Sequence, residues 1–294
     1  MPRLLSIGEC MIELAPTADG TYSMGFAGDT FNTAWYARRI ANPSIDVAYL
    51  SAIGEDGPSA RMRAFMTGAG IVPELRVRVG GSVGLYMISL DKGERSFSYW
   101  RSASAARTLA DDLTDLPCKA DDIAYFSGIT MAILPEDGQK RLLDVLGRAR
   151  ASGVTVAFDP NLRPRLWKDT DTMCTAIMEA AQVCDIALPS FEDEQGYFGD
   201  ADITATADRY ARAGASTVVV KDGPGQVLVR SPSGEMSIAP KPVAEVIDTT
   251  AAGDSFNAGY LVGWMQGQGT DEAVRQGCDL ARKVIGARGA LVPV

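Results

Sequence analysis

The sequence contains no histidine among its 294 residues. That absence excludes Ser-His-Asp and Cys-His catalytic arrangements, zinc sites built on imidazole, and acid–base catalysis by histidine. Any proton transfer in this protein must therefore use a carboxylate, Lys, Tyr or Cys.

Cysteine is scarce, and long apolar runs are absent. The five cysteines are scattered, odd in number and never spaced as Cys-x-x-Cys, which is typical of a reduced cytoplasm, and we expect a cytoplasmic protein. No apolar run approaches the roughly 20 residues that span a bilayer. Glu9 and Glu13 interrupt the apolar N-terminal segment, so we expect neither a signal peptide nor membrane association.

Basic residues are in the minority. Lys and Arg together number 28 against 37 Asp and Glu, for a net charge of −9. Such a chain has no general attraction to nucleic acid, although a local basic site remains possible.

No Gly-x-x-x-x-Gly-Lys-[Ser/Thr] motif occurs, and the first strand runs into Ile7-Gly8-Glu9-Cys10 rather than Gly-x-Gly-x-x-Gly. These absences argue against P-loop NTPases and the usual dinucleotide dehydrogenases.

Short apolar segments alternate with helical patterns along the whole chain. The expected strands are Leu4–Gly8, Val47–Ile53, Ile123–Ser127, Val154–Phe158, Ile186–Leu188 and Thr217–Lys221. The expected helices are Asp29–Ile40, Pro58–Gly68, Pro135–Ala151, Asp171–Val183, Ile203–Ala213, Gly253–Gln266 and Asp271–Ala287. This alternation predicts βαβ units and a mostly parallel sheet covered on both faces, with ligands at the carboxyl ends of the strands.

Some segments depart from that rhythm. Gly84–Leu90 and Glu94–Trp100 flank Asp91-Lys92-Gly93, which is typical of a hairpin turn. Glu13–Ala15 and Thr21–Met24 form another possible strand pair. We expect these strands, within about residues 11–25 and 83–101, to make a small β lid over the site. Val227–Arg230 and Met236–Ala239 predict a further hairpin around Ser231-Pro232-Ser233-Gly234.

The strongest motif runs from Asp248 to Gly259, where a loop of small residues leads into an apolar helix. Small residues let backbone N–H groups approach a phosphate, and the helix start adds free donors and a positive dipole end. Asp254 at that start has two interpretations of about equal weight. It is either a helix cap or a carboxylate that accepts a proton beside an anion site.

A second small-residue turn, Ala27-Gly28-Asp29, begins another helix, with Asn32 in its first turn. Taken alone, an ordinary N-cap is the favoured interpretation. The functional alternative makes Asp29 and Asn32 hydrogen-bond partners of substrate hydroxyls.

Two further motifs carry arginine. Phe158–Trp167 follows a buried strand and holds Arg163 and Arg165 among prolines, which suits a carboxylate or phosphate, or else is a solvated loop. In Tyr99-Trp100-Arg101, strand alternation places Tyr99 and Arg101 on one face and Trp100 on the other. The first face could grip a substrate acid while Trp100 packs against the core or a partner subunit; the alternative is an ordinary aromatic cluster.

The two glycine-rich motifs, in this order and separation, resemble those of the ribokinase-like (PfkB) carbohydrate kinases. Within that family, the segments Gly8–Leu14, Tyr99–Ala106, Asn161–Trp167 and Asp248–Leu261 are most similar to the kinases of 2-keto-3-deoxygluconate. The resemblance covers essentially all of residues 1–294 and implies one three-layer α/β/α domain with a mostly parallel central sheet and a small β lid. It further implies transfer of the γ-phosphoryl group of ATP, with Mg²⁺, to a sugar acid, giving the 6-phosphate of 2-keto-3-deoxygluconate (2-dehydro-3-deoxy-D-gluconate).

The resemblance also implies roles for particular residues. The catalytic base falls on Asp254, and the anion hole falls on the backbone of Ala251, Ala252 and Gly253. The substrate turn falls on Gly28, Asp29 and Asn32, and the sugar acid is gripped at Tyr86, Tyr99, Arg101 and Arg163. Nucleotide contacts fall near Asn161, Arg163, Ser190, Lys221, Gly223 and Gly225, as well as on residues 251–253. No direct metal ligand is assigned.

Three positions depart from the family pattern: Ala27 and Ala251 stand where glycine is usual, and Ser190-Phe191-Glu192-Asp193 replaces Asn-x-x-Glu. We expect the loops to tolerate both extra methyl groups. We also expect Asp254 to be ionised at neutral pH, because an ordinary Asp has a pKa of about 3.9.

The resemblance leaves alternatives open. A fructokinase or nucleoside kinase of the same fold is the closest competitor, and a non-catalytic sugar-binding regulator is the alternative of a different class. Exposed lid strands also make a homodimer through the lid plausible.

Overall fold

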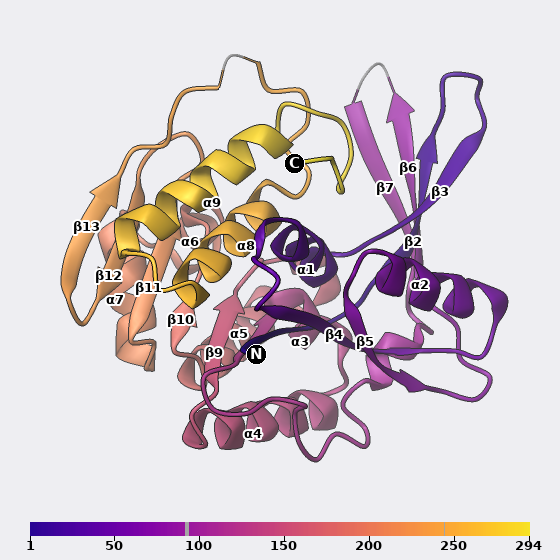
Figure 1. Cartoon of the computed structure of the whole chain (residues 1–294), viewed down its shortest axis with the longest axis horizontal. Helices are drawn as coiled ribbons and strands as arrows, with labels where there is room; N and C mark the ends of the chain where they lie inside the picture. Colours follow the sequence, from indigo (N-terminus) through magenta and orange to yellow (C-terminus); the bar gives the residue numbers. More distant parts are fainter. Residues whose placement is uncertain (92–93, 244) are drawn as a thin grey trace.

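A nine-stranded sheet forms the centre of the computed structural model, which describes residues 1–91, 94–243 and 245–294 (Figure 1). Its strand order is β13-β12-β11-β10-β9-β8-β1-β4-β5. The strands are β1 (Arg3–Ile7), β4 (Asp46–Ile53), β5 (Val72–Val77), β8 (Ile123–Ser127), β9 (Thr155–Asp159), β10 (Ile186–Ala187), β11 (Thr217–Lys221), β12 (Val227–Ser231) and β13 (Gly234–Ile238). Neighbours from β11 to β5 pair in parallel, whereas β12 and β13 add an antiparallel hairpin. The mostly parallel sheet is thus confirmed.

Helices cover both faces of this sheet. The α-helices are α1 (Asp29–Ile40), α2 (Gly57–Gly68), α3 (Gly128–Ile133), α4 (Glu136–Ala151), α5 (Thr170–Gln182), α6 (Phe191–Phe198), α7 (Ile203–Ala213), α8 (Ala252–Met265) and α9 (Thr270–Val284). Successive strand residues point to opposite faces, so Leu4 packs with α1, α8 and α9 while Leu5 packs with α4, α5 and α7. The result is the predicted three-layer arrangement.

A separate four-stranded sheet, ordered β3-β2-β6-β7, stands above the rim of the main sheet (Figure 1). Its strands are β2 (Met11–Pro16), β3 (Tyr22–Ala27), β6 (Leu85–Asp91) and β7 (Glu94–Trp100). Both hairpins expected for the lid are therefore present. The predicted turn at Lys92 and Gly93 lies outside the described residues.

The sequence patterns missed three elements: β5, α3 and α6. β5 is an edge strand that contains Pro73 and mixes exposed with half-buried side chains, so it lacks the apolar run of a buried strand. α3 is only six residues long, and α6 contains Gly196 and a glycine C-cap at Gly199. Short helices with little periodicity give a weak sequence signal.

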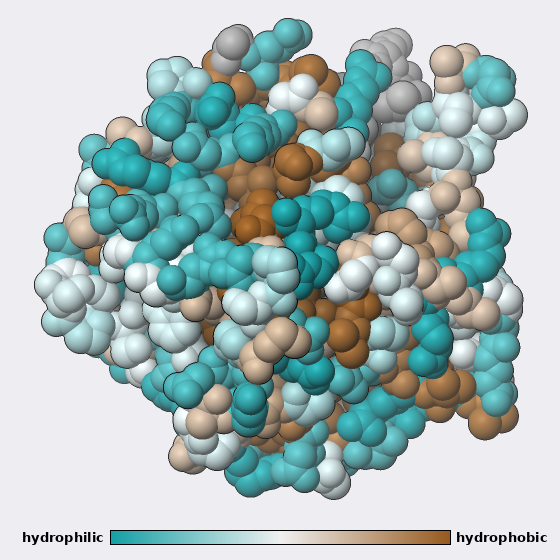
Figure 2. Space-filling view, in the orientation of Figure 1, coloured by the Kyte–Doolittle hydropathy of each residue, from teal (hydrophilic) through white to brown (hydrophobic). Residues whose placement is uncertain are grey.

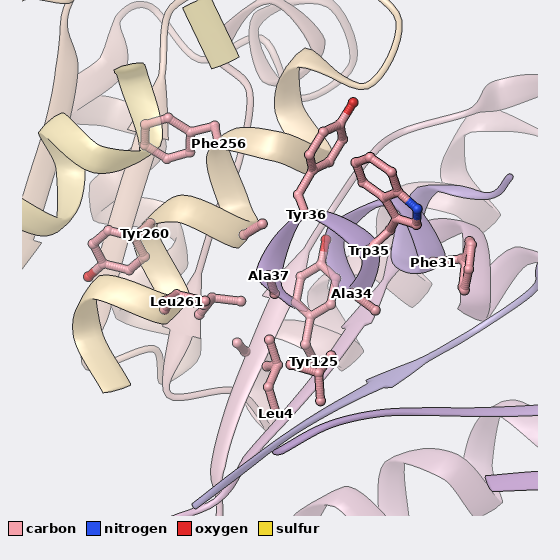
Figure 3. Close-up of a cluster of buried hydrophobic side chains, with 14 of the residues drawn as sticks. Leu4, Phe31, Ala34, Trp35, Tyr36, Ala37, Tyr125, Phe256, Tyr260 and Leu261 are labelled. Atoms are coloured by element: carbon pink, nitrogen blue, oxygen red, sulfur yellow. The ribbon is translucent and has the colours of Figure 1, made fainter. Parts of the chain in front are cut away.

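Helix α1 packs against α8 directly above the central strands, with Tyr125 of β8 between them (Figure 3). The buried cluster around this contact includes Leu4, Ala34, Tyr36, Ala37, Tyr125, Phe256, Tyr260 and Leu261, while Phe31 and Trp35 project from the side of α1 that faces away from α8. Each large side chain contributes about 1.5–3 kcal/mol through burial. This packing fixes the starts of the two helices relative to each other, and both helix starts carry predicted site residues.

The molecular surface carries both polar and apolar residues. Polar residues cover much of α9, and apolar patches appear between that helix and the lid (Figure 2). Within the described ranges, no helix combines the length and the apolar character that crossing a bilayer requires.

Candidate active site

A pocket of about 480 Å³ lies at the carboxyl ends of the parallel strands, beneath the lid. It is lined by many of the predicted residues: Gly28, Asp29, Asn32, Tyr86, Tyr99, Arg101, Asn161, Arg163, Ser190, Lys221, Ala251, Gly253 and Asp254. Ala252, Gly223 and Gly225 are outside its lining; the two glycines lie in the turn that follows β11. A second hollow of about 750 Å³ at the opposite end of the sheet, beside Lys119 and Trp264, contains no predicted site residue.

Asp254 lies in the first turn of α8 without capping that helix. The N-cap position is Ala251, which makes no side-chain cap hydrogen bond. Instead, the Asp254 Oδ2 atom accepts a hydrogen bond of 2.8 Å from Nδ2 of Asn32, near the start of α1. The packing of α1 on α8 therefore turns this carboxylate toward the pocket, and the capping interpretation is wrong.

The pKa of Asp254 differs from the ordinary value that we expected. Burial raises its pKa from 3.8 to about 8, and the carboxylates of Asp29 and Asp159 add to the rise, while Asn32 and Arg163 oppose it. The pKa of Asp254 in the unliganded protein therefore lies above the ordinary value on which the expectation of an ionised Asp254 rested. Three carboxylates that are far apart in sequence converge on one pocket and favour the neutral acid.

The start of α8 presents backbone N–H groups to the pocket. The Ala252 N–H donates to the carbonyl of Thr249 (3.2 Å). Gly253 and Asp254 follow in the first helical turn, where N–H groups have no partner within the helix. Of the three residues expected to form the anion hole, Ala251, Ala252 and Gly253, only Gly253 has its N–H group in the unpaired first turn, and Asp254 adds a second N–H group there. Ala251 adopts a left-handed conformation with φ of 61°, so its methyl group is tolerated at the cost of about 1 kcal/mol of strain.

The turn before α1 approaches the β1–β2 loop closely. A Cβ atom on Gly28 would lie 2.1 Å from the Glu9 carbonyl oxygen, so no larger residue fits there. Asp29, next in sequence, accepts a hydrogen bond of 3.0 Å from Nδ2 of Asn161. Burial raises the pKa of Asp29, and Asp159 adds to the rise. Asn161, which was expected near the nucleotide, thus contacts the helix start that carries Asp29.

Arg101 lies at the lid side of the pocket and forms an ion pair with Glu9. The Glu9 side chain is fully buried, and burial raises its pKa although Arg101 opposes the rise. A Cβ atom on Gly84 would lie 2.7 Å from Glu9 Oε1 and 3.3 Å from the Arg101 Cβ atom. Glycine at position 84 therefore leaves space for the buried Glu9–Arg101 ion pair at this end of the pocket.

Two tyrosines complete the lid side. The Tyr86 hydroxyl donates to the Glu13 carboxylate, and the rings of Tyr86 and Tyr99 lie 5.9 Å apart. Tyr99 and Arg101 both line the pocket, whereas Trp100 does not and is exposed. The predicted alternation of these residues is confirmed, and among the described residues Trp100 belongs to none of the buried hydrophobic clusters.

The opposite side of the pocket is cationic. Arg163 is half-exposed and lies 3.7 Å from the Asp193 carboxylate at the start of α6. Lys221, at the end of β11, is nearly buried beside Asp159, at a distance of 3.6 Å. Two positive side chains at the carboxyl ends of strands, facing a helix start, suit a polyanionic ligand such as a nucleotide.

Sequence reasoning missed several pocket residues, among them Glu9, Asp159 and Asp193. A signal was present for the first two, because each is an acidic residue that follows a buried apolar strand or ends one. In parallel sheets that position faces the ligand. Among the described residues there is no group of three or more His, Cys, Asp or Glu side chains that could hold a metal ion.

Comparison with known proteins agrees with this geometry. Residues 1–294 match the family model described as "pfkB family carbohydrate kinase". The chain is 39% identical to the 2-dehydro-3-deoxygluconokinase of Dickeya dadantii, covering 98% of this chain and 96% of that one. Its fold is similar to a PfkB protein from Polaromonas sp. JS666, with a TM-score of 0.86, 25% identity, and coverage of 98% and 96% of the two chains. The aminoimidazole riboside kinase of Salmonella enterica, solved with its riboside and an ATP analogue, has a TM-score of 0.85 at 21% identity, with 98% and 94% covered.

Proposed function

The chain belongs to the PfkB family of carbohydrate kinases, and we propose that it uses ATP to phosphorylate 2-keto-3-deoxygluconate to the 6-phosphate. Relatives that match over the full length carry the name 2-dehydro-3-deoxygluconokinase. The single structural observation that supports this substrate is Arg101, whose guanidinium group lies at the lid side of the pocket beside Tyr99.

A carboxylate on the sugar explains why an arginine stands there. Charge-assisted hydrogen bonds between guanidinium and carboxylate are about twice as strong as neutral ones, and a guanidinium group has five N–H donors, so Arg101 can bind a substrate carboxylate in addition to its ion pair with Glu9. The pocket then has two ends. The sugar acid lies toward Arg101 and the tyrosines, and the nucleotide phosphates lie toward Lys221 and Arg163, with Asp254 between them.

The chemistry follows from that placement. The sugar hydroxyl oxygen attacks the γ-phosphorus, the bond from that phosphorus to the β–γ bridging oxygen breaks, and ADP leaves. Asp254, once deprotonated, orients the hydroxyl and takes its proton as the new bond forms. The N–H groups of Gly253 and Asp254, with Lys221 and Arg163, meet the charge on the transferred group. Closure of the lid over the sugar excludes water, which would otherwise hydrolyse ATP.

Magnesium is the ion that this chemistry requires, and the donor set suits it. Mg²⁺ is usually held by one or two carboxylates together with substrate phosphates and waters. Asp159 and Asp193 line the pocket beside the phosphate end, and their carboxylates are the groups that would hold the ion together with the phosphates. When bound, the ion neutralises phosphate charge.

A sugar panel tests the substrate. ADP release is measured with 2-keto-3-deoxygluconate, gluconate, fructose, ribose and nucleosides, alongside thermal shift with each sugar alone. We expect turnover with the keto-deoxy acid, and we expect Arg101→Ala to raise KM for that acid at least about tenfold while KM for ATP is unchanged. Arg212→Ala, on the exposed surface of α7, is the matched control.

Each other outcome identifies a different alternative. Preference for fructose would make the protein a fructokinase, and an unchanged acid-sugar KM in Arg101→Ala would remove Arg101 from the role. Binding of a sugar without any ADP release would favour the non-catalytic regulator.

The lid also supports a proposal about assembly. Strand β7 is an edge of the lid sheet, and its Phe97, Tyr99 and Trp100 side chains are 39%, 53% and 58% exposed. An edge strand with exposed aromatic side chains favours pairing with a second copy. We propose a homodimer through the lid, which light scattering after size exclusion tests; a monomer at micromolar concentration contradicts it, and Trp100→Ser is expected to weaken the dimer.

A further inference from the structure

We propose that Asn257 is a positioning residue, which holds the Lys221 ammonium group beside the phosphate-binding start of α8. The inference rests on the kinase function proposed above and deepens it. It gives a function to a buried network of polar side chains beneath the pocket, which the mechanism above does not use.

Asn257 is fully buried in α8, one turn after Asp254. Its Oδ1 atom accepts a hydrogen bond of 3.0 Å from Nζ of Lys221. Its Nδ2 atom donates to Asp159 Oδ2 at 2.7 Å and to the Tyr125 hydroxyl at 3.1 Å. An ammonium group can only donate and a carboxylate can only accept, so these partners fix the orientation of the amide. One side chain of α8 thus contacts the last residues of β9 and β11 and the middle of β8.

The network brings Lys221 to the anion site. A Cβ atom built on Gly253 would have Nζ of Lys221 as its nearest neighbour, at 3.9 Å. Gly253 supplies one of the backbone donors at the start of α8, so the ammonium group and the backbone donors face the same space. An ammonium group has three N–H donors, and the bond to Asn257 uses one of them.

An amide suits this position better than a second carboxylate. Lys221 is nearly buried, and its ammonium group already has the Asp159 carboxylate as an ion-pair partner at 3.6 Å. Asn257 fixes the flexible lysine chain without cancelling more of its charge. A fixed positive charge stabilises the phosphoryl group in transfer because the protein need not reorganise during the reaction.

Kinetics of matched variants test the assignment. We expect Asn257→Ala to lower kcat/KM for ATP about tenfold to a hundredfold, with little change in KM for the sugar. Tyr125→Phe is the control, because it removes a structural partner of the same amide and leaves the bonds to Lys221 and Asp159 in place. It should retain near wild-type kinetics. Asn257→Ser serves if Asn257→Ala does not fold, as judged by circular dichroism and thermal unfolding.

A double-mutant cycle separates positioning from general disruption. If Asn257 acts through Lys221, then Lys221→Met combined with Asn257→Ala loses no more kcat/KM for ATP than Lys221→Met alone. Additive losses, wild-type kinetics in the Asn257 variants, or equal losses in Tyr125→Phe would each overturn the assignment.

Calorimetric titration with ATP, without sugar, distinguishes a failure of the proposed kinase function from a failure of the role proposed for Asn257. Wild-type protein that binds no ATP contradicts the kinase function itself. Wild-type protein that binds ATP, with Asn257→Ala binding it equally and turning over normally, contradicts only the role of Asn257.

Discussion

Replacing Asp254 by Asn should have opposite effects on activity and stability. The amide cannot take the proton of the sugar hydroxyl, so kcat should fall about 10²–10⁴-fold. The same substitution removes a carboxylate whose pKa the fold raises from 3.8 to about 8, chiefly through burial. A fold that raises the pKa of an acid is destabilised by the charged form of that acid, so removing the charge should stabilise the protein.

The pH dependence of that gain follows from proton linkage. Between about pH 4 and pH 8, the folded chain retains the Asp254 proton that the unfolded chain has lost, so stability falls as pH rises. The pKa gap sets an upper limit of about 5 kcal/mol at pH 8. Asp254 is only half-buried, and water screens part of the penalty, so we expect about 1–2 kcal/mol.

Thermal unfolding of the unliganded protein measures the effect. At about pH 8, Asp254→Asn should unfold at a temperature about 2–6 °C higher than wild type, and at about pH 4 the difference should nearly vanish. Asp115→Asn, an exposed aspartate, is the control and should show no such trend. In the wild type, kcat/KM for the sugar should rise with pH toward about 8 as Asp254 ionises. A pH-independent difference in unfolding temperature, or near wild-type kcat in Asp254→Asn, would refute the reasoning.

Three further predictions concern other parts of the molecule. Gly84→Ala places a Cβ atom 2.7 Å from Glu9 Oε1 and so disturbs the Glu9–Arg101 ion pair. KM for the sugar acid should rise several-fold in steady-state assays while KM for ATP stays constant. Equal changes in both KM values would contradict the role of this ion pair in binding the sugar acid. Tyr36→Phe removes hydrogen bonds to the Ala290 carbonyl and from the Val292 N–H, and should cost about 1–2 kcal/mol in urea unfolding; no loss would show that water replaces them. Glu194→Ala leaves Arg209 with less compensation in a buried cluster and should cost about 2–4 kcal/mol by the same assay, with kcat nearly unchanged; a large drop in kcat would contradict a purely structural role for Glu194.

Much of the fold could be predicted because local patterns agree with the tertiary structure. The Asp29–Ile40 and Ile203–Ala213 helices and the Ile123–Ser127 strand have the predicted bounds. Each combines apolar periodicity with clear start or stop signals, and packing only reinforces such segments. β5 and α6 were missed because their stability comes from neighbours rather than from their own periodicity.

The candidate site also combines features that local sequence patterns predict with features that depend on packing. Local patterns in the sequence marked Asp29 and Asp254 at helix starts, Arg163 after a strand and Arg101 after a hairpin arm as candidates, and the family resemblance supplied their roles. The packing of distant segments is what brings Asn32 to Asp254 and pairs Glu9 with Arg101, and burial together with Asp29 and Asp159 raises the pKa of Asp254. Hydrogen bonds and electrostatic interactions act over a few ångströms, and only packing brings residues more than 200 positions apart to that distance.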